Sequence, residues 1–551
     1  MKCILHVGLH KTGTTSIQDF CYQNRSLLLD NDINYIYLYR NNSNPLFSLY
    51  CKDPLSYGAN KRRGIRTNRE IENYNLYIEK LFQNKLLNNR SNNVLISGED
   101  ISFLDYDGLR SLKDQIAPYF DLISIIIYVR PPVSTLCSKI SHFVSNVGRS
   151  LDQMLDIVNN NPEKHVFYQD AIEKFFEVFG YDNVTVRPYD KSSLCKGDII
   201  SDFTDTLGLK KEVDKLQKHS HENTSFSYEA LKIFSRINKK MPLFLNGEFN
   251  FERGKLQYGL RILLGAIGGS KLYLSSETRN KVKDICYQDI YWLYKHTHID
   301  FFLESCSNKH ADSAVSQCVE DSELLAFSDK LLQLILDNQF PDDNFQNDII
   351  NLFIQINQID KNEITAAFYI GLGELLLAKS YNEAANGNFQ QALLIDPDNP
   401  LPYLRLSQIY AKSGYNDDAV NKILCAINLN KNNSNYYQHL SNLYMRKGQL
   451  EDAESTLDKA VRLDPESSAL HFKLSQVHTR NNNIDSAITE IYRAIELNNG
   501  NYKFYHHLGN LFKKKGDLDR AEVNIQEAVK LEPENQKLQR DFNKIMELKK
   551  G

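Results

Sequence analysis

The sequence predicts a protein of two parts: a three-layer α/β domain with a central parallel sheet, followed by an all-α solenoid. Three observations support this prediction. A glycine-bounded loop separates a β-rich segment from a helical pattern near the N-terminus, a continuous apolar run covers residues 122–129, and a period of 34 residues governs the last third of the chain. Because 551 residues exceed what one hydrophobic core organises, two or more domains are expected in any case.

The bulk composition is that of an ordinary globular protein. With 42% hydrophobic and 24% charged residues, the chain does not have the composition of a disordered one, and a net charge of −4 gives no general attraction to nucleic acid. No apolar run reaches the roughly 18 residues of a transmembrane helix. The nine cysteines are scattered singly, so neither a disulfide framework nor a structural zinc site is predicted, and no metal is expected. These features favour a cytoplasmic protein and leave peripheral membrane association open.

The 34-residue period is carried by small residues. Two series of alanines recur with this spacing: Ala385, Ala419, Ala453, Ala487 and Ala521, and Ala392, Ala426, Ala460, Ala494 and Ala528. A third position holds only glycine or serine: Gly373, Ser407, Ser441, Ser475 and Gly509. Because antiparallel helices approach closely only where side chains are small, these positions are predicted to mark helix crossings.

This period resembles the tetratricopeptide repeat (TPR), in five copies over residues 366–535, with a polar capping helix at 536–551. Stacked repeats of this kind usually present a concave groove. The resemblance therefore implies that the array binds a protein partner or the acceptor of the N-terminal domain. A role as a spacer is the alternative.

The N-terminal loop has the composition of a phosphate-binding loop. Residues 3–7 form a β-rich run, Gly8 and Gly13 bound the loop, and a helical pattern follows. A strand, a glycine-bounded loop and a helix in this order direct backbone N–H groups at an anion. In nucleoside triphosphatases a lysine follows the second glycine, but here Thr14 stands in that place and Lys11 lies inside the loop.

A second motif follows the apolar run at residues 122–129, which has the character of a strand buried on both faces of a parallel sheet. The run ends at Arg130, and Ser138 lies eight residues later in a predicted helix. Because a planar guanidinium pairs well with phosphate oxygens, Arg130 is a candidate anion ligand. A surface ion pair is the alternative interpretation of this arginine.

Together the two motifs resemble those of sulfotransferases that use 3'-phosphoadenosine 5'-phosphosulfate (PAPS), of the bacterial or glycan type with a P-loop-like fold. The resemblance implies that Lys11 contacts the sulfate and the bridging oxygen, and that Arg130 and Ser138 bind the 3'-phosphate. It also implies that the rest of the loop holds the 5'-phosphate: Thr12, Gly13, Thr14, Thr15 and Ser16. The Asn-Thr-Ser triplet at 223–225 is similar to a late element of such domains, whereas the Arg-Lys-Gly signature of the cytosolic eukaryotic members is missing.

Sulfuryl transfer also needs a base for the acceptor's proton. A short predicted strand ends just before Glu99 and Asp100, and the carboxyl ends of parallel strands face the ligand crevice. Glycan and protein-tyrosine sulfotransferases place a catalytic glutamate after the corresponding strand. The resemblance therefore implies that Glu99 is the catalytic base and Lys11 the catalytic cation. Asp100, His10 and His142 are left as alternative bases.

The expected organisation is a sulfotransferase domain at residues 1–300, a linker with lead-in helices at 301–365, the repeats at 366–535 and the capping helix at 536–551. The expected activity is the transfer of a sulfuryl group from PAPS to a hydroxyl or amine of a bacterial glycan, without a metal. The alternatives are a P-loop kinase or nucleotidase, and a non-catalytic adaptor that contains repeats.

Overall fold

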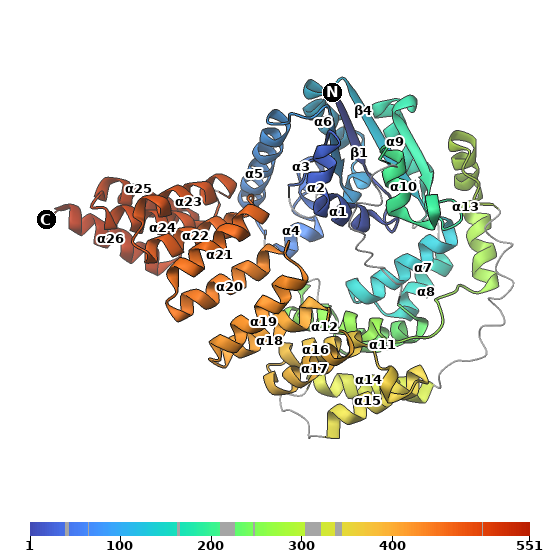
Figure 1. Ribbon diagram of the computed structural model, residues 1–551. Coiled ribbons are helices and arrows are strands. Elements are labelled where there is room, and N and C mark those ends of the chain that lie inside the picture. Colours follow the sequence, from blue (N-terminus) through green and yellow to red (C-terminus); the bar gives the residue numbers. More distant parts are fainter. Residues whose placement is uncertain are drawn as a thin grey trace. The chain divides into compact units, whose positions relative to one another are not determined.

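The computed structural model describes residues 1–38, 43–63, 65–161, 166–209, 226–245, 248–302, 321–336, 344–498 and 500–550. The chain divides into two compact units, Met1–Ile364 and Thr365–Gly551 (Figure 1). Each unit buries its own clusters of apolar side chains.

The first unit is built on a five-stranded parallel sheet. Its strands in chain order are β1 (Lys2–His6), β2 (Ile33–Tyr35), β3 (Asn93–Ser97), β4 (Leu122–Val129) and β5 (Val184–Pro188). They lie in the order β2-β3-β1-β4-β5. β1 and β4 are neighbours in the sheet. β2, which follows β1 in the chain, lies on one side of this pair, whereas β5, which follows β4, lies on the other. Ligands of open parallel sheets bind at such a reversal, outside the carboxyl ends of the strands, which here are those of β1 and β4.

Helices connect and cover these strands. Those of the first unit are α1 (Thr14–Gln23), α2 (Arg25–Asp30), α3 (Ser43–Tyr50), α4 (Gly58–Arg62), α5 (Asn68–Leu87), α6 (Tyr106–Ile116), α7 (Pro132–His142), α8 (Leu151–Asn160), α9 (Tyr168–Phe179), α10 (Ile199–Thr206), α11 (Tyr228–Lys240), α12 (Phe251–Gly265), α13 (Ser276–Thr297), α14 (Asp321–Leu336) and α15 (Asn344–Asn357). Two short segments also matter for the site: the 3-10 helix η1 (Glu99–Phe103) and the π-helix η3 (Phe143–Val147). A small antiparallel pair, β6 (Phe244–Leu245) and β7 (Glu248–Phe249), lies outside the main sheet.

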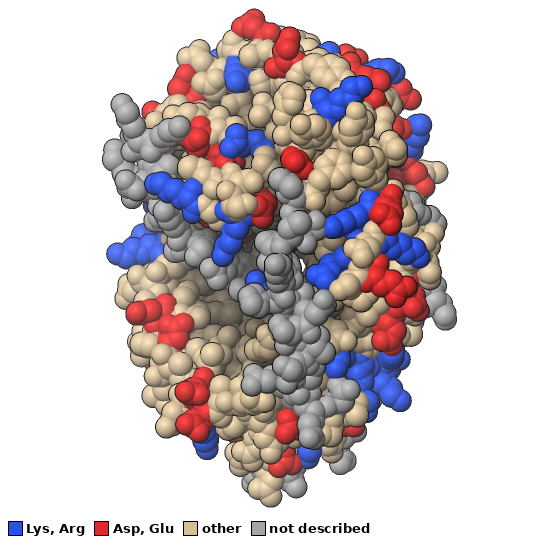
Figure 2. Space-filling view, turned by 90° about the vertical axis from the view of Figure 1, so that its right-hand side faces the viewer, with Lys and Arg blue, Asp and Glu red and all other residues tan. Residues whose placement is uncertain are grey.

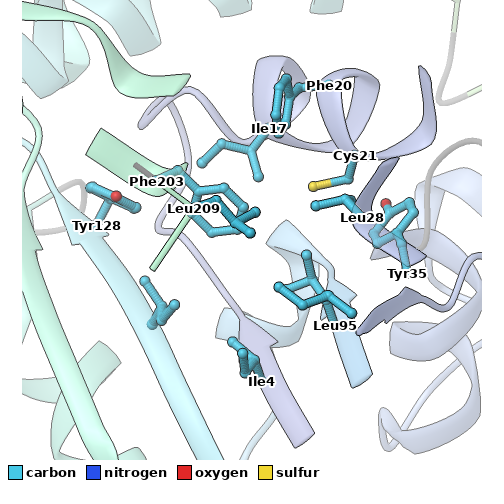
Figure 3. Close-up of a cluster of buried hydrophobic side chains, with 12 residues drawn as sticks. Ile4, Ile17, Phe20, Cys21, Leu28, Tyr35, Leu95, Tyr128, Phe203 and Leu209 are labelled. Carbon is cyan, nitrogen blue, oxygen red and sulfur yellow. The ribbon is translucent and has the colours of Figure 1, made fainter. Parts of the chain in front are cut away.

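Both faces of the main sheet are buried. On one face, Ile4, Leu95 and Tyr128 of the strands pack against Ile17 of α1 and Phe203, which lies on α10 (Figure 3). The side chains of opposite alternation, which point to the other face, are equally buried: Cys3, Leu5, Val94, Ile96, Ile125, Ile127 and Val129. A strand buried on both faces needs an uninterrupted apolar sequence, and this is why the run at 122–129 is continuous rather than alternating.

The main strands around the site lie where the sequence predicts them. β4 has the bounds of the predicted strand, and α7 begins with Pro132, whose missing N–H costs nothing at the first position of a helix. β2 is not among the predicted strands, because three residues are too few to show a period.

The region predicted as a linker with lead-in helices, residues 301–365, is largely helical where it is described. α14 and α15 pack on each other, and α14 also packs on α11. The described residues up to Ile364 belong to the first unit. Residues 303–320 and 337–343 of this region lie outside the described part of the chain.

The second unit is a series of helix pairs. Its helices are α16 (Ala366–Ala378), α17 (Asn382–Ile395), α18 (Pro400–Lys412), α19 (Asn416–Leu429), α20 (Ser434–Lys447), α21 (Leu450–Leu463), α22 (Ser468–Arg480), α23 (Ile484–Leu497), α24 (Tyr502–Lys514), α25 (Leu518–Leu531) and α26 (Gln536–Lys550). Each even-numbered helix from α16 to α24 packs on the helix that follows it, and α26 packs on α25. The two alanine series are fully buried within these pairs, as expected of helix crossings.

The small residue of each repeat does more than leave space. Ser407 donates a hydrogen bond to the Ala419 carbonyl at 2.7 Å, and Ser475 donates one to the Ala487 carbonyl at 2.6 Å, so the hydroxyl ties the first helix of a repeat to the second. At Gly509 no side chain fits at all, because a Cβ there would lie 2.7 Å from Ile525.

The surface carries charges of both signs. In the view of Figure 2, Lys and Arg side chains are interspersed with Asp and Glu, and no broad field of one sign is visible on this face. In the described part of the chain, no helix combines the length and the apolar character needed to cross a bilayer.

Candidate functional site

The loop between β1 and α1 has a backbone shaped to receive an anion. Lys11 has φ 71° and Gly13 has φ 80°, both in the left-handed region. Gly13 is the N-cap of α1 and supplies no side chain to satisfy the first N–H groups of the helix. These N–H groups, together with the positive end of the helix dipole, favour negative charge at this point. On the first turn of α1, Thr15 is exposed and Ser16 is half-buried.

Polar atoms crowd against the start of this loop. A Cβ added to Gly8 would lie 2.8 Å from Thr14 Oγ1, 2.9 Å from Thr12 Oγ1 and 3.1 Å from His6 Nε2, so only glycine fits at this position. Burial lowers the pKa of His6 to about 3, which keeps the ring neutral, and its Nδ1 lies 2.8 Å from Ser97 Oγ. Among the described residues, His6 Nε2 and Thr14 Oγ1 are buried without a hydrogen-bond partner. The Thr14 hydroxyl is therefore available to a ligand.

Arg130, at the end of β4, reaches the N-terminal loop. Its Nη1 donates a hydrogen bond to the Lys11 carbonyl at 3.1 Å, and its guanidinium lies over the Tyr189 ring at 5.6 Å. Its Nε donates to Ser134 Oγ at 2.8 Å. Ser138, which the resemblance pairs with Arg130, lies one turn further along α7, so Ser134 is the nearer hydroxyl. The structure thus brings together two motifs that are more than one hundred residues apart in the sequence, at the carboxyl ends of adjacent strands.

The Lys11 side chain ends against the last residue of α7. Its Nζ lies 2.8 Å from Nδ1 of His142, and the Asn146 amide nitrogen lies 3.0 Å from the same atom. Two donors aimed at Nδ1 make this nitrogen an acceptor, so its lone pair is not available to act as a base. Burial is the main cause that lowers the pKa of Lys11, and Glu99 acts in the opposite direction.

The three remaining candidate bases are distinguished by their contacts. Glu99 Oε1 accepts a hydrogen bond from the Lys11 N–H at 3.1 Å, so this carboxylate faces the loop. Asp100 instead accepts a hydrogen bond from the Tyr57 hydroxyl. His10 lies between the two carboxylates, 3.3 Å from Glu99 and 3.1 Å from Asp100. Glu99 is therefore the carboxylate that accepts a hydrogen bond from the Lys11 N–H, while His10 contacts both carboxylates.

A small pocket of about 40 Å³ adjoins the loop. It is lined by Thr12, Arg130 and Lys139 and by aromatic side chains that include Phe103 and Phe167. Burial lowers the pKa of Lys139 to about 8. Sequence reasoning did not single out this lysine, because an isolated lysine in a helix carries no motif and its enclosure is a property of the fold.

The arrangement can bind an anion and accept a proton beside it. Lys11 and Arg130 supply positive charge, the start of α1 supplies N–H groups, and Glu99 supplies a carboxylate next to the loop. In the described ranges, no group of three or more His, Cys, Asp or Glu side chains could hold a metal ion. The triplet at 223–225 lies outside the described residues.

Comparison with known proteins identifies the second unit. Profiles of the tetratricopeptide repeat match residues 440–502 and 502–535, both in that unit. The C-terminal region therefore contains tetratricopeptide repeats, which confirms that prediction. No curated protein is similar enough in sequence to this chain to count as a relative.

Several solved structures resemble part of the chain. MamA is 22% identical over 30% of this chain and 97% of its own, with a TM-score of 0.29. YrrB, described as a TPR protein with an unusual peptide-binding site, is 19% identical over 37% of this chain and 98% of its own, with a TM-score of 0.30. TTC0263, a thermophilic TPR protein of Thermus thermophilus, is 24% identical over 33% of this chain and 99% of its own, with a TM-score of 0.27.

Proposed function

We propose that the first unit is a PAPS-dependent sulfotransferase that acts on a hydroxyl or amine of an acceptor, of the class found in bacterial glycans. The observation that supports this proposal is the hydrogen bond of 3.1 Å between Arg130 and the Lys11 carbonyl. PAPS carries phosphate at both ends of one ribose, so its protein needs two neighbouring anion sites. The loop around Lys11 would hold the 5'-phosphosulfate, and Arg130 with Ser138 the 3'-phosphate.

The proposed reaction assigns a task to each group. Glu99 takes the proton of the acceptor hydroxyl as the new bond from its oxygen to sulfur forms, and the bond from sulfur to the 5'-phosphate oxygen breaks. Lys11 and the N–H groups at the start of α1 stabilise the charge that develops on the leaving phosphate, which departs as part of adenosine 3',5'-bisphosphate. Because such transition states are loose, positioning and charge stabilisation carry most of the catalysis.

A kinase or nucleotidase is the alternative enzyme. It is disfavoured because Lys11 lies inside the loop, where its side chain turns toward His142, instead of following the second glycine. A non-catalytic adaptor is disfavoured because a half-buried lysine, an arginine and a carboxylate all converge on one loop. In an adaptor without a ligand at this loop, these three side chains would have no anion to bind and no proton to accept.

Adenosine 3',5'-bisphosphate should raise the melting temperature of the full-length protein by several degrees. A ligand that binds only the folded state at about 100 times its Kd stabilises that state by about 2.7 kcal/mol. Differential scanning fluorimetry with this nucleotide, with AMP and with ATP at equal concentrations provides the measurement. AMP lacks the 3'-phosphate and should give a clearly smaller shift. A larger shift with ATP, together with release of phosphate, would instead support the kinase or nucleotidase.

The repeat array, we further propose, binds an acidic segment of a partner protein. Neighbouring first helices of the repeats touch, since Lys473 of α22 donates to Asn442 of α20 at 3.2 Å and Arg446 of α20 donates to the Ala411 carbonyl of α18 at 3.0 Å. These first helices form one row, along which two kinds of side chain recur every 34 residues. An exposed cation lies in the last turn of each of four helices: Lys412, Arg446, Arg480 and Lys514. An amide side chain lies one turn earlier in each of these helices: Gln408, Asn442, Gln476 and Asn510.

Reversal of three of these charges should weaken the binding of an acidic probe. The triple variant R446E/R480E/K514E should bind a fluorescent oligoglutamate peptide at least about tenfold more weakly than the wild type, because each lost cation removes one charge partner. Anisotropy titrations at low and moderate salt provide the measurement. The matched control is K459E/R462E on the second helix α21, which should bind as the wild type does. Equal losses in both variants would show a general charge effect and contradict the proposal.

A further inference from the structure

Helix α9 carries a buried lysine whose ammonium contacts the segment that bears Glu99. Nζ of Lys174 donates hydrogen bonds to the Ser102 carbonyl at 2.6 Å and to the Leu104 carbonyl at 2.7 Å. Ser102 lies in η1, and Leu104 is the C-cap of that short helix. The last carbonyls of a helix have no partner within it and carry partial negative charge, so a cation is favourable there. Lys174 therefore closes the C-terminal end of η1.

This end of η1 is connected to Glu99 and through it to the phosphate loop. Ser102 Oγ donates a hydrogen bond to the Glu99 carbonyl at 2.8 Å. Ser102 is buried, and a hydrogen bond is electrostatically stronger in such surroundings than in water. Glu99 Oε1 in turn accepts the Lys11 N–H at 3.1 Å. An unbroken series of hydrogen bonds thus runs from Lys174 through Ser102 and Glu99 to the loop.

The burial of this lysine has a cost in stability. Burial lowers the pKa of Lys174 to about 8, while Asp105 and Asp170 act in the opposite direction. A lowered pKa means that the folded protein disfavours the charged form. An apolar side chain such as methionine would fill the same position on α9 without this cost, but it could not donate to carbonyls. The hydrogen bonds to η1 are therefore what the lysine provides here.

We propose that Lys174 is a positioning residue that holds Glu99 at the correct distance from the loop and from the acceptor hydroxyl. This assignment rests on the proposed function, in which Glu99 takes the acceptor's proton. A general base must lie within hydrogen-bond reach of that proton, and a displacement of about 1 Å can cost about a hundredfold in rate. Lys174 touches neither substrate; it acts through Ser102 and the backbone of Glu99.

Two substitutions break this series of hydrogen bonds at different points. K174M should lower kcat by about 10–100-fold, because η1 loses the bonds that fix its end. S102A removes only the hydroxyl between Lys174 and Glu99 and should lower kcat by about 3–10-fold, the usual effect of one hydrogen bond. The Kd for adenosine 3',5'-bisphosphate, measured by isothermal titration, should stay within about threefold in both variants, since these bonds go to η1 and not to Arg130 or α1. K174R keeps donors at this position and should recover part of the rate.

A double-mutant cycle separates positioning of Glu99 from general support of the fold. In an E99Q background, K174M and S102A should each change the residual kcat by less than about twofold, because residues that act as one unit are not additive. A lysine that only supported the fold would lower the rate of E99Q as well. The matched control is K113M. Lys113 of α6 donates to the Val178 carbonyl of α9 at 2.6 Å, so this variant loses the same kind of bond on the same helix and should keep full kcat.

Each contrary outcome has a distinct meaning. Full kcat in K174M, or equal losses in the wild-type and E99Q backgrounds, would refute the role of Lys174 and leave the proposed function intact. If K174M did not fold, the same comparison with S102A would decide. Full kcat in E99Q would show that Glu99 is not the base and would overturn this assignment with it. If the wild type transferred no sulfate from PAPS, the proposed function itself would be wrong.

Discussion

Replacing Lys11 with alanine should lower the rate of sulfate transfer by about 10²–10³-fold, the usual cost of losing one preorganised donor to a developing charge. The loss should appear in kcat, because Lys11 is assigned to the leaving phosphate, whose charge grows in the transition state. Single-turnover assays with radiolabelled PAPS provide the measurement. K80A on α5, which removes an exposed lysine of the same domain, is the matched control and should retain full activity.

The same variant should not be less stable than the wild type. Burial lowers the pKa of Lys11 in the folded state, so the folded protein disfavours the charged form and the ammonium destabilises it at all pH values below its unfolded pKa. Lys11 also has φ 71°, which costs a residue with a side chain roughly 1–2 kcal/mol. K11G removes both penalties and should raise the melting temperature while lowering the transfer rate as K11A does. A variant that lost activity only because it unfolded would contradict this account, and unchanged transfer in folded K11A would refute the proposed role of Lys11.

The strands and the repeats were predictable because their signals are local or periodic. The apolar run at 122–129 predicts β4 from its own composition, since burial on both faces requires it. The small residues at Ser407 and Ser475 predict helix crossings from spacing alone. In the structure their hydroxyls also bond to carbonyls of the second helix, which spacing does not show. The crossing points can therefore be predicted from the period, and the bonds that hold them come from the structure.

The site was predictable only in part, because part of it is made by packing. Glycines and a lysine in one short loop are a local signal, and a strand end with Arg130 is another. The contact of Lys11 with His142 depends on where α7 ends. No spacing marks this contact in the sequence. Similarly, the proximity of Ser134 to Arg130 follows from the pitch of α7, which places this serine one turn before Ser138.

Glu99 and Asp100 are adjacent in the sequence, and their contacts predict opposite results on substitution. E99Q should reduce kcat by about 10²–10⁴-fold, the range for loss of a general base. The amide oxygen of glutamine can still accept the Lys11 N–H that Glu99 accepts at 3.1 Å, so the loop should keep its shape and the Kd for adenosine 3',5'-bisphosphate should stay within about twofold. D100N should lower kcat by less than about tenfold, because Asp100 is engaged by the Tyr57 hydroxyl and by His10 and makes no hydrogen bond to the Lys11 N–H.

The same comparison separates a base from a group that only positions the loop. If D100N, rather than E99Q, lost its rate, the base would be Asp100, and the hydrogen bond of Glu99 to the Lys11 N–H would serve to hold the loop alone.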